Sequence, residues 1–574
     1  MLASLNAIFI RLARDYIFAA KIVILAILTL MASASYHFGI FDRLENFTLD
    51  QRFRLRPPLA THPKIILVEI AEDSIESIGR WPWDREWHAL AIKALKDLGA
   101  KSVAFDILFS EPSEPATDTL LAKVIAASKN TYIPIALHGK DGTAWDVVRS
   151  IPEIREAAKG EGHIAVRLDP DGVLRRIPAQ IHALDQTFWQ IGFLLAFDYL
   201  GINGDKASFS SAAIRIPVPN NQDIVVPLTP TGDIVINWPG RWKDSFQHVS
   251  FVDVVASYEQ SLKGEPTRIP VEMFKDSLCV IGVSATALFD IKAAPLEPAY
   301  PAMGVNAVIA NSVLQRAFMR PLSAGVYHML LVCLSLIIFV ILWQAEYARA
   351  MFSIVILAAT YLIVTYGLFV WMGIILQVAY PLFLILVSYM TITAYHQIVI
   401  SIERQRLMRL ATTDPLTGLY NIGHFKRLLS AEISSTRLRS NKNLCVVMID
   451  GDRFKSINDK YGHPGGDEVL RGMAEVLRSN CRALDVAARY GGEEFIMMLP
   501  GAPLDSAVKV AEKMRQGIEQ KQFHLTGGSD VQTVTASFGV AQFEINETIE
   551  SLLKRADQAL YQAKNGGRNC VHAL

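Results

Sequence analysis

Apolar residues gather in two long stretches that separate two blocks of mixed hydrophobic and polar pattern. The first stretch follows Arg11 and Arg14 and covers about residues 17–38, with Lys21 near its start. The second begins near residue 325, and its 350–402 portion holds no Asp, Glu, Lys or Arg, which is too long for one bilayer crossing. The pattern therefore predicts four transmembrane helices, at 17–38, 325–345, 351–371 and 373–395.

The first apolar stretch has two interpretations. Its "ASAS" segment (Ala32–Ser35) offers the small residues of a signal-peptide cleavage site. The stretch continues into "YHFGIF", however, and is long enough to span a bilayer while Lys21 reaches the interface. We favour an uncleaved anchor over a cleaved signal peptide, and both interpretations export the segment that follows.

The block at 39–322 has the pattern of a soluble α/β domain. "KIILVEI" (64–70) and "KSVAFDILF" (101–109) are apolar enough for buried strands, and a helical pattern at 87–100 separates them. "DSLCVIGVSA" (276–285) adds another strand near the end of the block. We expect a mixed α/β sheet in an extracytoplasmic domain.

The block at 412–574 predicts a second α/β domain. Strands are expected at 443–450, 485–490, 494–499 and 534–543, and helices at 466–481 and 504–520. This order predicts a central, mostly antiparallel sheet covered by helices. The segment at 396–411, which leaves the last span, is either a signalling and dimerisation helix or a solvated connector. It ends before "DPLTGL", because Pro415 disfavours helical geometry in the residue before it.

Charge and cysteine content narrow the classes of function. Lys and Arg total 56 and so do Asp and Glu, so the chain lacks the basic excess of a nucleic-acid-binding protein. The five cysteines form no CxxC pair, which indicates neither a zinc site nor a disulfide framework. Basic residues before the first span and after the last one place the N-terminus (1–16) and the 412–574 domain on the cytoplasmic side.

Candidate chemistry lies in the 412–574 block. Asp450 ends an apolar strand, and Glu493 and Glu494 follow the glycine turn Gly491–Gly492. Hard carboxylate oxygens of this kind suit Mg²⁺, which commonly accompanies phosphate-bearing substrates. Side chains that could hold phosphates or a guanine edge are Lys455, Lys564, Arg568, Asn458 and Asp467. Each of these residues alone has an ordinary structural explanation, so this reasoning reaches only magnesium-dependent nucleotide chemistry.

Five motifs occur in order over residues 412–574: "DPLTGLYN", "IDGDRFKSINDKYGHPGGDEVL", "RYGGEEF", "TASFGVA" and "ADQALYQAKNGGRN". Together they resemble the GGDEF family of diguanylate cyclases in its GGEEF form. The resemblance implies a homodimer that condenses two GTP into cyclic di-GMP with release of pyrophosphate. It implies two Mg²⁺ ions, with Mn²⁺ as an alternative, in each active site.

The same resemblance implies roles for individual residues. Asp450, the backbone carbonyl of Gly451, and Glu493 would bind metal, and Glu493 would be the general base toward the 3′-hydroxyl. The implied substrate contacts are Phe454, Lys455, Asn458, Asp467, Lys564 and Arg568. Gly451 departs from the bulky apolar residue usual at its position, and "NIGHF" (421–425) lacks a basic pair common in the family. Asp467 argues against the relatives that make mixed cyclic dinucleotides, where serine is typical.

A product-inhibition site is the second feature that the resemblance implies. "RALD" (482–485) lies just before the GGEEF turn and matches the RxxD motif at which cyclic di-GMP binds. Arg482 and Asp485 can hydrogen-bond a guanine edge or a phosphate. Lys513 stands where relatives often supply another basic contact.

The outer block also has a resemblance. "DQRFRLRPP", "VEIAEDSIESIGRWPWDREWHA", "LGAKSVAFDILFSEPS" and "GVNAVIANSVL" are similar to the second type of CHASE extracytoplasmic sensor. That family has one transmembrane helix before the sensor and three after it, and it implies no particular ligand. The aromatic residues of "RWPWDREW" could form a binding patch, but packed core aromatics are the more common outcome.

Three functions are compatible with these observations. The first is a sensor-regulated diguanylate cyclase in a bacterial inner membrane, with GTP as substrate and an unknown extracytoplasmic ligand. The second is a catalytically silent receptor of the same fold that binds cyclic di-GMP or GTP. A transporter ranks last, because the spans contain few ionisable residues that could form a transport pathway, among them Lys21, His328 and His396.

Overall fold

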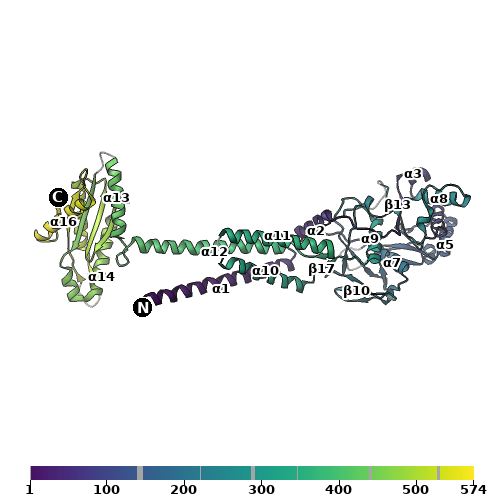
Figure 1. Ribbon diagram of the computed structural model, residues 1–574, viewed down its shortest axis with the longest axis horizontal. Helices are drawn as coiled ribbons and strands as arrows, with labels where there is room; N and C mark the ends of the chain where they lie inside the picture. Colours follow the sequence, from purple (N-terminus) through teal and green to yellow (C-terminus); the bar gives the residue numbers. More distant parts are fainter. Residues whose placement is uncertain are drawn as a thin grey trace. The chain divides into compact units, whose positions relative to one another are not determined.

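The chain divides into two structural units, Met1–Thr393 and Ala394–Leu574. The structure is a computed structural model that describes residues 2–138, 146–219, 221–285, 291–344, 347–438, 443–525 and 531–574. Each unit contains a sheet covered by helices, and the first unit also holds a set of long apolar helices (Figure 1).

The block at 39–322 is called the sensor block below, after the family that it resembles. A seven-stranded sheet forms its centre. The pairings β13–β1, β1–β14, β14–β2, β2–β3 and β3–β5 are parallel, and β3–β4 is antiparallel. The strands are β1 (Ile65–Ile70), β2 (Ser102–Phe105), β3 (Thr131–His138), β4 (Asp146–Val148), β5 (Gly160–His163), β13 (Gln247–Ser250) and β14 (Leu278–Val283).

Both faces of this sheet are covered, as a mainly parallel sheet requires. Successive strand residues point to opposite faces, so Ile66 and Val68 of β1 enter one core cluster while Ile65 and Leu67 enter the other. The first cluster includes residues of α4 (Arg85–Asp97), α5 (Pro115–Ser128) and α8 (Phe251–Lys263). The second includes residues of α7 (Ile191–Leu200) and α9 (Ala302–Gln315).

Shorter elements complete the sensor block. They are α2 (Asp42–Leu55), α3 (Glu72–Ile78), α6 (Pro152–Ala157), η1 (Gly204–Lys206), η2 (Trp242–Asp244), η3 (Val271–Phe274), β6 (Arg176–Pro178), β7 (Gln180–Ala183), β8 (Gln186–Trp189), β9 (Ser208–Phe209), β10 (Ala213–Ile216), β11 (Ile224–Pro227), β12 (Asp233–Val235), β15 (Ile291–Lys292) and β16 (Tyr300–Pro301). In the aromatic segment, Trp83 is buried, and Trp81 and Trp87 pack partly buried against the same cluster. These tryptophans therefore belong to the core.

Four helices in the described part of the chain are long and apolar enough to cross a membrane. They are α1 (Leu2–His37), α10 (Ala324–Gln344), α11 (Tyr347–Met372) and α12 (Ala379–Thr412). The apolar portion of α1 is Phe18–His37, near the expected span at 17–38. Residue 345, the end of the second expected span, lies outside the described residues.

The expected start of the last span, residue 373, was wrong. Gly373 has a positive φ of 67°, which ends α11, and its carbonyl accepts a hydrogen bond of 2.7 Å from the backbone N–H of Arg320. The next two residues form β18 (Ile374–Ile375), which pairs with β17 (Arg320–Pro321). Helix α12 therefore begins only at Ala379. It continues without a break to Thr412, so the 396–411 segment belongs to the same helix as the last span.

The second unit is built on a six-stranded sheet in the order β19-β21-β22-β20-β25-β26. The three central pairings are antiparallel, and the two edge pairings, β19–β21 and β25–β26, are parallel. The strands are β19 (Tyr420–Asn421), β20 (Leu444–Gly451), β21 (Val486–Gly491), β22 (Glu494–Pro500), β25 (Ala536–Gln542) and β26 (Val571–Ala573), and a separate short pair is β23 (Phe523–His524) with β24 (Val531–Gln532).

Helices cover both faces of this second sheet (Figure 1). Along β20, Cys445 and Val447 face a cluster that includes α14 and α15, while Val446 and Met448 face one that includes α13 and α16. The four helices are α13 (Ile422–Leu438), α14 (Phe454–Asn480), α15 (Leu504–Gln520) and α16 (Ile549–Asn565). Strand β20 is buried along its whole length, so its last residues are fixed in place.

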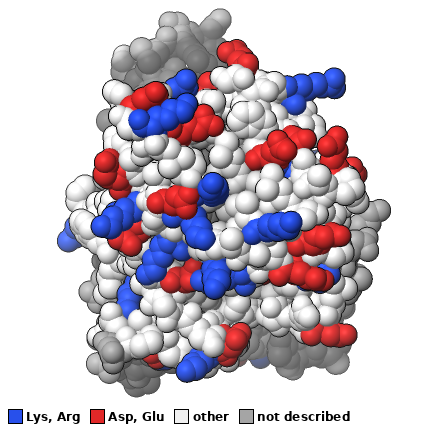
Figure 2. Space-filling model, turned by 90° about the vertical axis from the view of Figure 1, so that its right-hand side faces the viewer, with Lys and Arg blue, Asp and Glu red and all other residues white. Residues whose placement is uncertain are grey.

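Charged side chains are interspersed on the face of the molecule drawn in Figure 2. Lys and Arg alternate there with Asp and Glu, and neither sign forms a broad field. This agrees with the equal totals of 56 basic and 56 acidic residues in the sequence.

Candidate active site

The glycine turn joins β21 to β22. Gly491 is the last residue of β21 and pairs with Glu494, so Gly492 and Glu493 form the two-residue turn. The expected turn, Gly491–Gly492, was therefore wrong by one residue. Gly492 has a positive φ of 51°, the backbone conformation that such hairpin turns require. The Arg489 side chain donates hydrogen bonds of 3.0 and 2.7 Å to the Gly492 carbonyl, which holds the turn beside the strand.

Asp450 lies beside this turn. Its register partner across the β20–β22 ladder is Glu494, and the N–H of Gly451 donates to the carbonyl of Glu493 at 3.4 Å. From the last turn of α16, Lys564 Nζ lies 2.7 Å from Asp450 Oδ2. The fold thus brings together residues from three distant parts of the sequence: Asp450, the pair Glu493 and Glu494, and Lys564.

Negative charge exceeds positive charge at this point. Burial raises the pKa of Asp450, Lys564 opposes that shift, and the nearby carboxylates Glu493 and Asp452 add to it. Burial also raises the pKa of Glu494, and the charge of Asp450 contributes. Close carboxylates disfavour one another's ionised form, so a cation among them would stabilise the site.

The donors suit a hard divalent cation. Among the described residues, no three His, Cys, Asp or Glu side chains form a ready metal cluster. The available set is two carboxylates, Asp450 and Glu493, and the backbone carbonyl of Gly451, all oxygen donors of the type that Mg²⁺ prefers. A Cβ at Gly451 would meet Met473 Sδ at an ordinary 3.4 Å, so the missing side chain does not alter the carbonyl as a donor.

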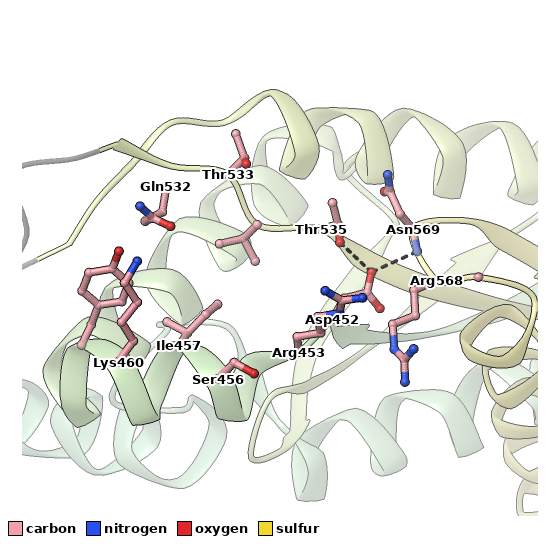
Figure 3. Close-up of a pocket in the computed structure, with 13 residues that line it drawn as sticks. Asp452, Arg453, Ser456, Ile457, Lys460, Gln532, Thr533, Thr535, Arg568 and Asn569 are labelled. Atoms are coloured by element: carbon pink, nitrogen blue, oxygen red, sulfur yellow. Dashed lines mark hydrogen bonds between the residues drawn. The ribbon is translucent and has the colours of Figure 1, made fainter.

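Asp452 lies two residues after Asp450, but its carboxylate is hydrogen-bonded within the protein. Its carboxylate accepts hydrogen bonds from Thr535 Oγ1 (2.8 Å), Ser537 Oγ (2.7 Å) and the N–H of Asn569 (3.0 Å). Figure 3 shows the bonds from Thr535 and Asn569. Asp452 therefore ties the end of β20 to β25 and to the loop after α16. The sequence alone did not reveal this role, because Thr535, Ser537 and Asn569 are distant along the chain.

The expected base-contacting residues lie at a bend in α14. Gly462 has a φ of 68° and interrupts the helix, with Pro464 two residues later. A Cβ at Gly466 would lie 2.0 Å from Asn458 Oδ1 and 3.0 Å from Phe454 Cζ, so only glycine permits this approach. The bend thus brings the segment that carries Asp467 against Asn458 and Phe454.

The expected phosphate contacts occupy two places. Lys455 is exposed in the first turn of α14. Arg568 is exposed just beyond α16, and it lines a cavity of about 380 Å³. The cavity runs along the start of α14 from Arg568 to Lys460, as Figure 3 shows. The sequence interpretation assigned no role to two other cations of this cavity, Arg453 and Lys460.

The RxxD motif forms a tight turn between α14 and β21. Asp485 Oδ2 accepts a hydrogen bond of 2.8 Å from the N–H of Arg482, and the Arg482 carbonyl accepts from the N–H of Asp485 at 3.1 Å. The Arg482 side chain is exposed. Lys513 is exposed on α15, and no hydrogen bond or ion pair of the described residues joins it to this turn.

The motif "DPLTGL" also contributes to the glycine turn. Asp414 accepts hydrogen bonds from the N–H and hydroxyl of Thr417 at 2.9 and 2.8 Å and forms an ion pair of 3.3 Å with Arg489. Since Arg489 holds the Gly492 carbonyl, the segment after α12 is linked to the turn that carries Glu493. The sequence interpretation gave Asp414 no role of its own, since Pro415 accounted for the helix end and Asp414 was one residue of a family motif.

Comparison with curated proteins finds relatives that match about three-tenths of the chain. Response regulator PleD of Caulobacter vibrioides is 43% identical over 168 residues, which are 29% of this chain and 36% of PleD. Diguanylate cyclase A of Treponema denticola is 41% identical over 175 residues, 30% of this chain and 47% of that protein. Diguanylate cyclase DgcM of Escherichia coli is 42% identical over 169 residues, 29% and 40% of the two chains. The matches span less than half of each relative.

Among solved structures, the coiled coil and GGDEF domain of DgcB from Caulobacter crescentus, in complex with c-di-GMP, is similar. It is 30% identical, with a TM-score of 0.32, and the match covers 33% of this chain and 99% of that one.

Two family models match the chain. The CHASE2 domain model matches residues 22–342, more than half of the 574 residues. The model described as diguanylate cyclase, GGDEF domain, matches residues 411–570. The chain therefore belongs to the CHASE2 domain family, and it carries a C-terminal GGDEF domain of the diguanylate cyclase type.

Proposed function

We propose that the chain is a membrane-bound, sensor-regulated diguanylate cyclase that condenses two GTP into cyclic di-GMP and two pyrophosphates. The observation that carries the proposal is the grouping of Asp450, Glu493 and Lys564, where a buried strand end meets a tight turn. Two anionic groups and one cation at one point suit a metal-bound triphosphate. The model described as diguanylate cyclase, GGDEF domain, matches residues 411–570, which hold this grouping, and relatives named as diguanylate cyclases match about three-tenths of the chain.

Each residue has a distinct part in the proposed reaction. Asp450, the Gly451 carbonyl and Glu493 would hold two Mg²⁺ ions. These ions would neutralise charge on the phosphates and lower the pKa of the attacking hydroxyl. Glu493 accepts the proton of the 3′-hydroxyl, since the turn leaves it only partly buried and able to face a substrate. Lys564 and Arg568 neutralise the triphosphate, and Lys455 adds charge from the first turn of α14.

Guanine is the proposed base for the pocket at the bend of α14. Asn458 presents a carbonyl oxygen and an amide donor, and Asp467 presents acceptors for the ring N–H and exocyclic amine. Phe454 lies next to Asn458 across Gly466 and supplies an apolar wall. This combination reads the edge that distinguishes guanine from adenine.

Turnover requires two copies, because each bound GTP supplies one hydroxyl to the other. The cytoplasmic end of α12 offers a surface for pairing: Ile400, Leu407 and Leu410 are 46%, 57% and 64% exposed. Apolar residues spaced in this way favour helix pairing between identical chains. Product bound at Arg482 and Asp485 would hold the domains apart and limit synthesis.

The proposed location is a bacterial inner membrane. The four apolar helices indicate a membrane protein. Four crossings put the N-terminus and the cyclase domain on the same side, and the arginines after the last span place that side in the cytoplasm. The CHASE2 domain then lies outside and senses an unidentified ligand.

The proposal is tested with the full chain in lipid nanodiscs, supplied with GTP and Mg²⁺. We expect cyclic di-GMP from the wild type and a loss of about 10²–10⁴-fold in Glu493→Gln, because the base is removed. The matched control is Glu544→Gln, whose side chain is 74% exposed and pairs with Arg555 away from the turn. A silent receptor would bind cyclic di-GMP yet form none, and Glu493→Gln would then change nothing.

A further inference from the structure

Helix α2 lies where the long apolar helices meet the sensor block (Figure 1). It is short, 14 residues, yet five of its side chains are buried: Glu45, Leu49, Asp50, Arg52 and Phe53. Three of these five are charged. Ordinary surface helices bury apolar residues and leave charges in water, so buried charges on α2 require specific partners.

One set of partners is the first turn of α12. The Glu45 carboxylate, 8% exposed as a residue, accepts hydrogen bonds from the N–H of Val378 (2.8 and 2.9 Å) and the N–H of Ala379 (2.8 Å). The first N–H groups of a helix have no partner within the helix. Glu45 therefore caps α12 from another helix, with a charge that the helix dipole favours.

Other residues in and next to α2 also contact the start of α12 and the residues just before it. Arg52 donates to the Leu376 carbonyl at 2.9 Å and lies 3.5 Å from Glu45. Tyr380, in the first turn of α12, donates to Asp42 at 2.8 Å and accepts from the N–H of Phe41 at 3.2 Å. Burial raises the pKa of Glu45, and the two backbone N–H groups and Arg52 oppose that shift.

The other set of partners lies in the sensor. Arg175, 1% exposed, donates two hydrogen bonds of 2.7 Å to Asp50 and also binds Asp169 and Asp171. Arg56, just past the end of α2, donates to Asn237 at 2.8 Å and to the Trp238 carbonyl. One helix thus holds the sensor through Asp50 and Arg56 and holds α12 through Glu45.

The far end of α12 leads to the glycine turn. The helix continues to Thr412, and Asp414, two residues later, pairs with Arg489, which in turn holds the Gly492 carbonyl. A helix transmits a displacement of one end to the other with little loss, because each turn is hydrogen-bonded to the next.

We propose that α2 is the coupling element between sensor and output helix, with Glu45 as the positioning residue that fixes the first turn of α12 to the sensor. The regulatory consequence rests on the proposed cyclase function, whereas the attachment itself does not. A change in the sensor that moves Arg175 would move Asp50, and through Glu45 it would move α12.

The attachment is tested by hydrogen exchange in the full chain in nanodiscs, without nucleotide. In Glu45→Gln, one amide oxygen replaces two charged acceptors, so we expect the segment around Val378–Ala379 to exchange at least about tenfold faster. Asp253→Asn is the matched control, since it breaks an exposed pair with Arg268 elsewhere in the sensor. Unchanged exchange in Glu45→Gln would overturn the proposal, and it would do so whether or not the protein makes cyclic di-GMP.

Coupling is tested by a double-mutant cycle with Asp50→Asn. If α2 connects the two contacts, each single substitution changes the exchange of the α12 start and the rate of cyclic di-GMP synthesis, and the double variant adds little. Two merely structural contacts would give additive effects, which would overturn the proposal. Should Glu45→Gln fail to fold, Tyr380→Phe probes the same junction from the α12 side and is expected to accelerate exchange in the same direction.

Discussion

Both units place three carboxylates around one cation, but the carboxylates are bonded differently. In the sensor, the guanidinium of Arg175 is surrounded by Asp50, Asp169 and Asp171, each of which is hydrogen-bonded to it. In the cyclase unit, Asp450, Glu493 and Glu494 gather with one cation, Lys564. In the sensor, the carboxylates are hydrogen-bonded to the guanidinium and hold structural elements together. In the second unit, carboxylate oxygens remain as acceptors for the proposed cation and substrate.

The same contrast separates two aspartates at the end of β20, Asp450 and Asp452. Asp452 receives three hydrogen bonds from the protein, and Asp450 faces Lys564 and two other carboxylates. Residue type and position on the strand do not distinguish Asp450 from Asp452. The two aspartates differ in the partners that the fold brings to each.

The largest expected effect separates these two aspartates. Asp450→Asn should reduce cyclic di-GMP synthesis by at least about 10²-fold, because it removes a proposed metal ligand, and should leave thermal stability nearly unchanged. Asp452→Asn should lower the unfolding free energy by about 1.5–3 kcal/mol, because charged hydrogen bonds are lost. Activity assays and thermal unfolding of both variants check this. Equal losses of stability in the two variants would contradict the division of roles.

A smaller effect is expected at the RxxD turn. Arg482→Ala should raise the concentration of cyclic di-GMP needed for half-inhibition by about tenfold or more, because a charged hydrogen-bond donor is lost. The initial rate should not change, since Arg482 is exposed and lies outside the turn with Glu493. Initial rates at rising product concentrations provide the measurement. Arg471→Ala, on the preceding helix, is a control that should keep wild-type inhibition.

A pH-dependent effect on stability, rather than on activity, concerns two titratable groups that the sensor buries without charge. His88 lies among aromatic rings and His163 is fully buried, and burial lowers the pKa of each to about 3. Between pH 6.5 and 3 the unfolded chain binds protons at these residues and the folded chain does not. Acid therefore destabilises the sensor, by about 1.4 kcal/mol per pH unit for each histidine.

Urea denaturation followed by tryptophan fluorescence at several pH values measures this slope. His88→Phe keeps a ring in the aromatic cluster and should remove about half of the two-histidine slope. A wild-type slope in that variant would show that His88 does not take part. The expected slope vanishes above pH 6.5, where both states are neutral at these residues.

The helix expected at 466–481 was predicted to begin too late, since α14 starts at Phe454. The central strands of the second unit were predicted well, and for a physical reason. Its buried strands are short apolar runs, and β20, β21 and β22 start and end within one residue of the predicted ranges. Helix α15 matches the expected 504–520, since its apolar residues repeat at helical spacing. The start of α12 was misplaced, because a run of apolar residues does not show that Gly373 adopts a positive φ.

The pattern of apolar and polar residues could not predict long-range contacts. The order of motifs implied Asp450, Glu493 and Lys564, but the ion pair of Lys564 with Asp450 required the fold. The roles of Asp452, Asp414 and Glu45 depend on partners 83, 75 and 333 residues away. No local spacing reports such contacts.

Product stoichiometry tests the central claim most directly. The full chain in lipid nanodiscs is supplied with GTP and Mg²⁺, and GTP, cyclic di-GMP and pyrophosphate are quantified together over time. The account predicts one cyclic di-GMP and two pyrophosphates for every two GTP consumed. Release of GDP and phosphate, or bound GTP that is never converted, would contradict it.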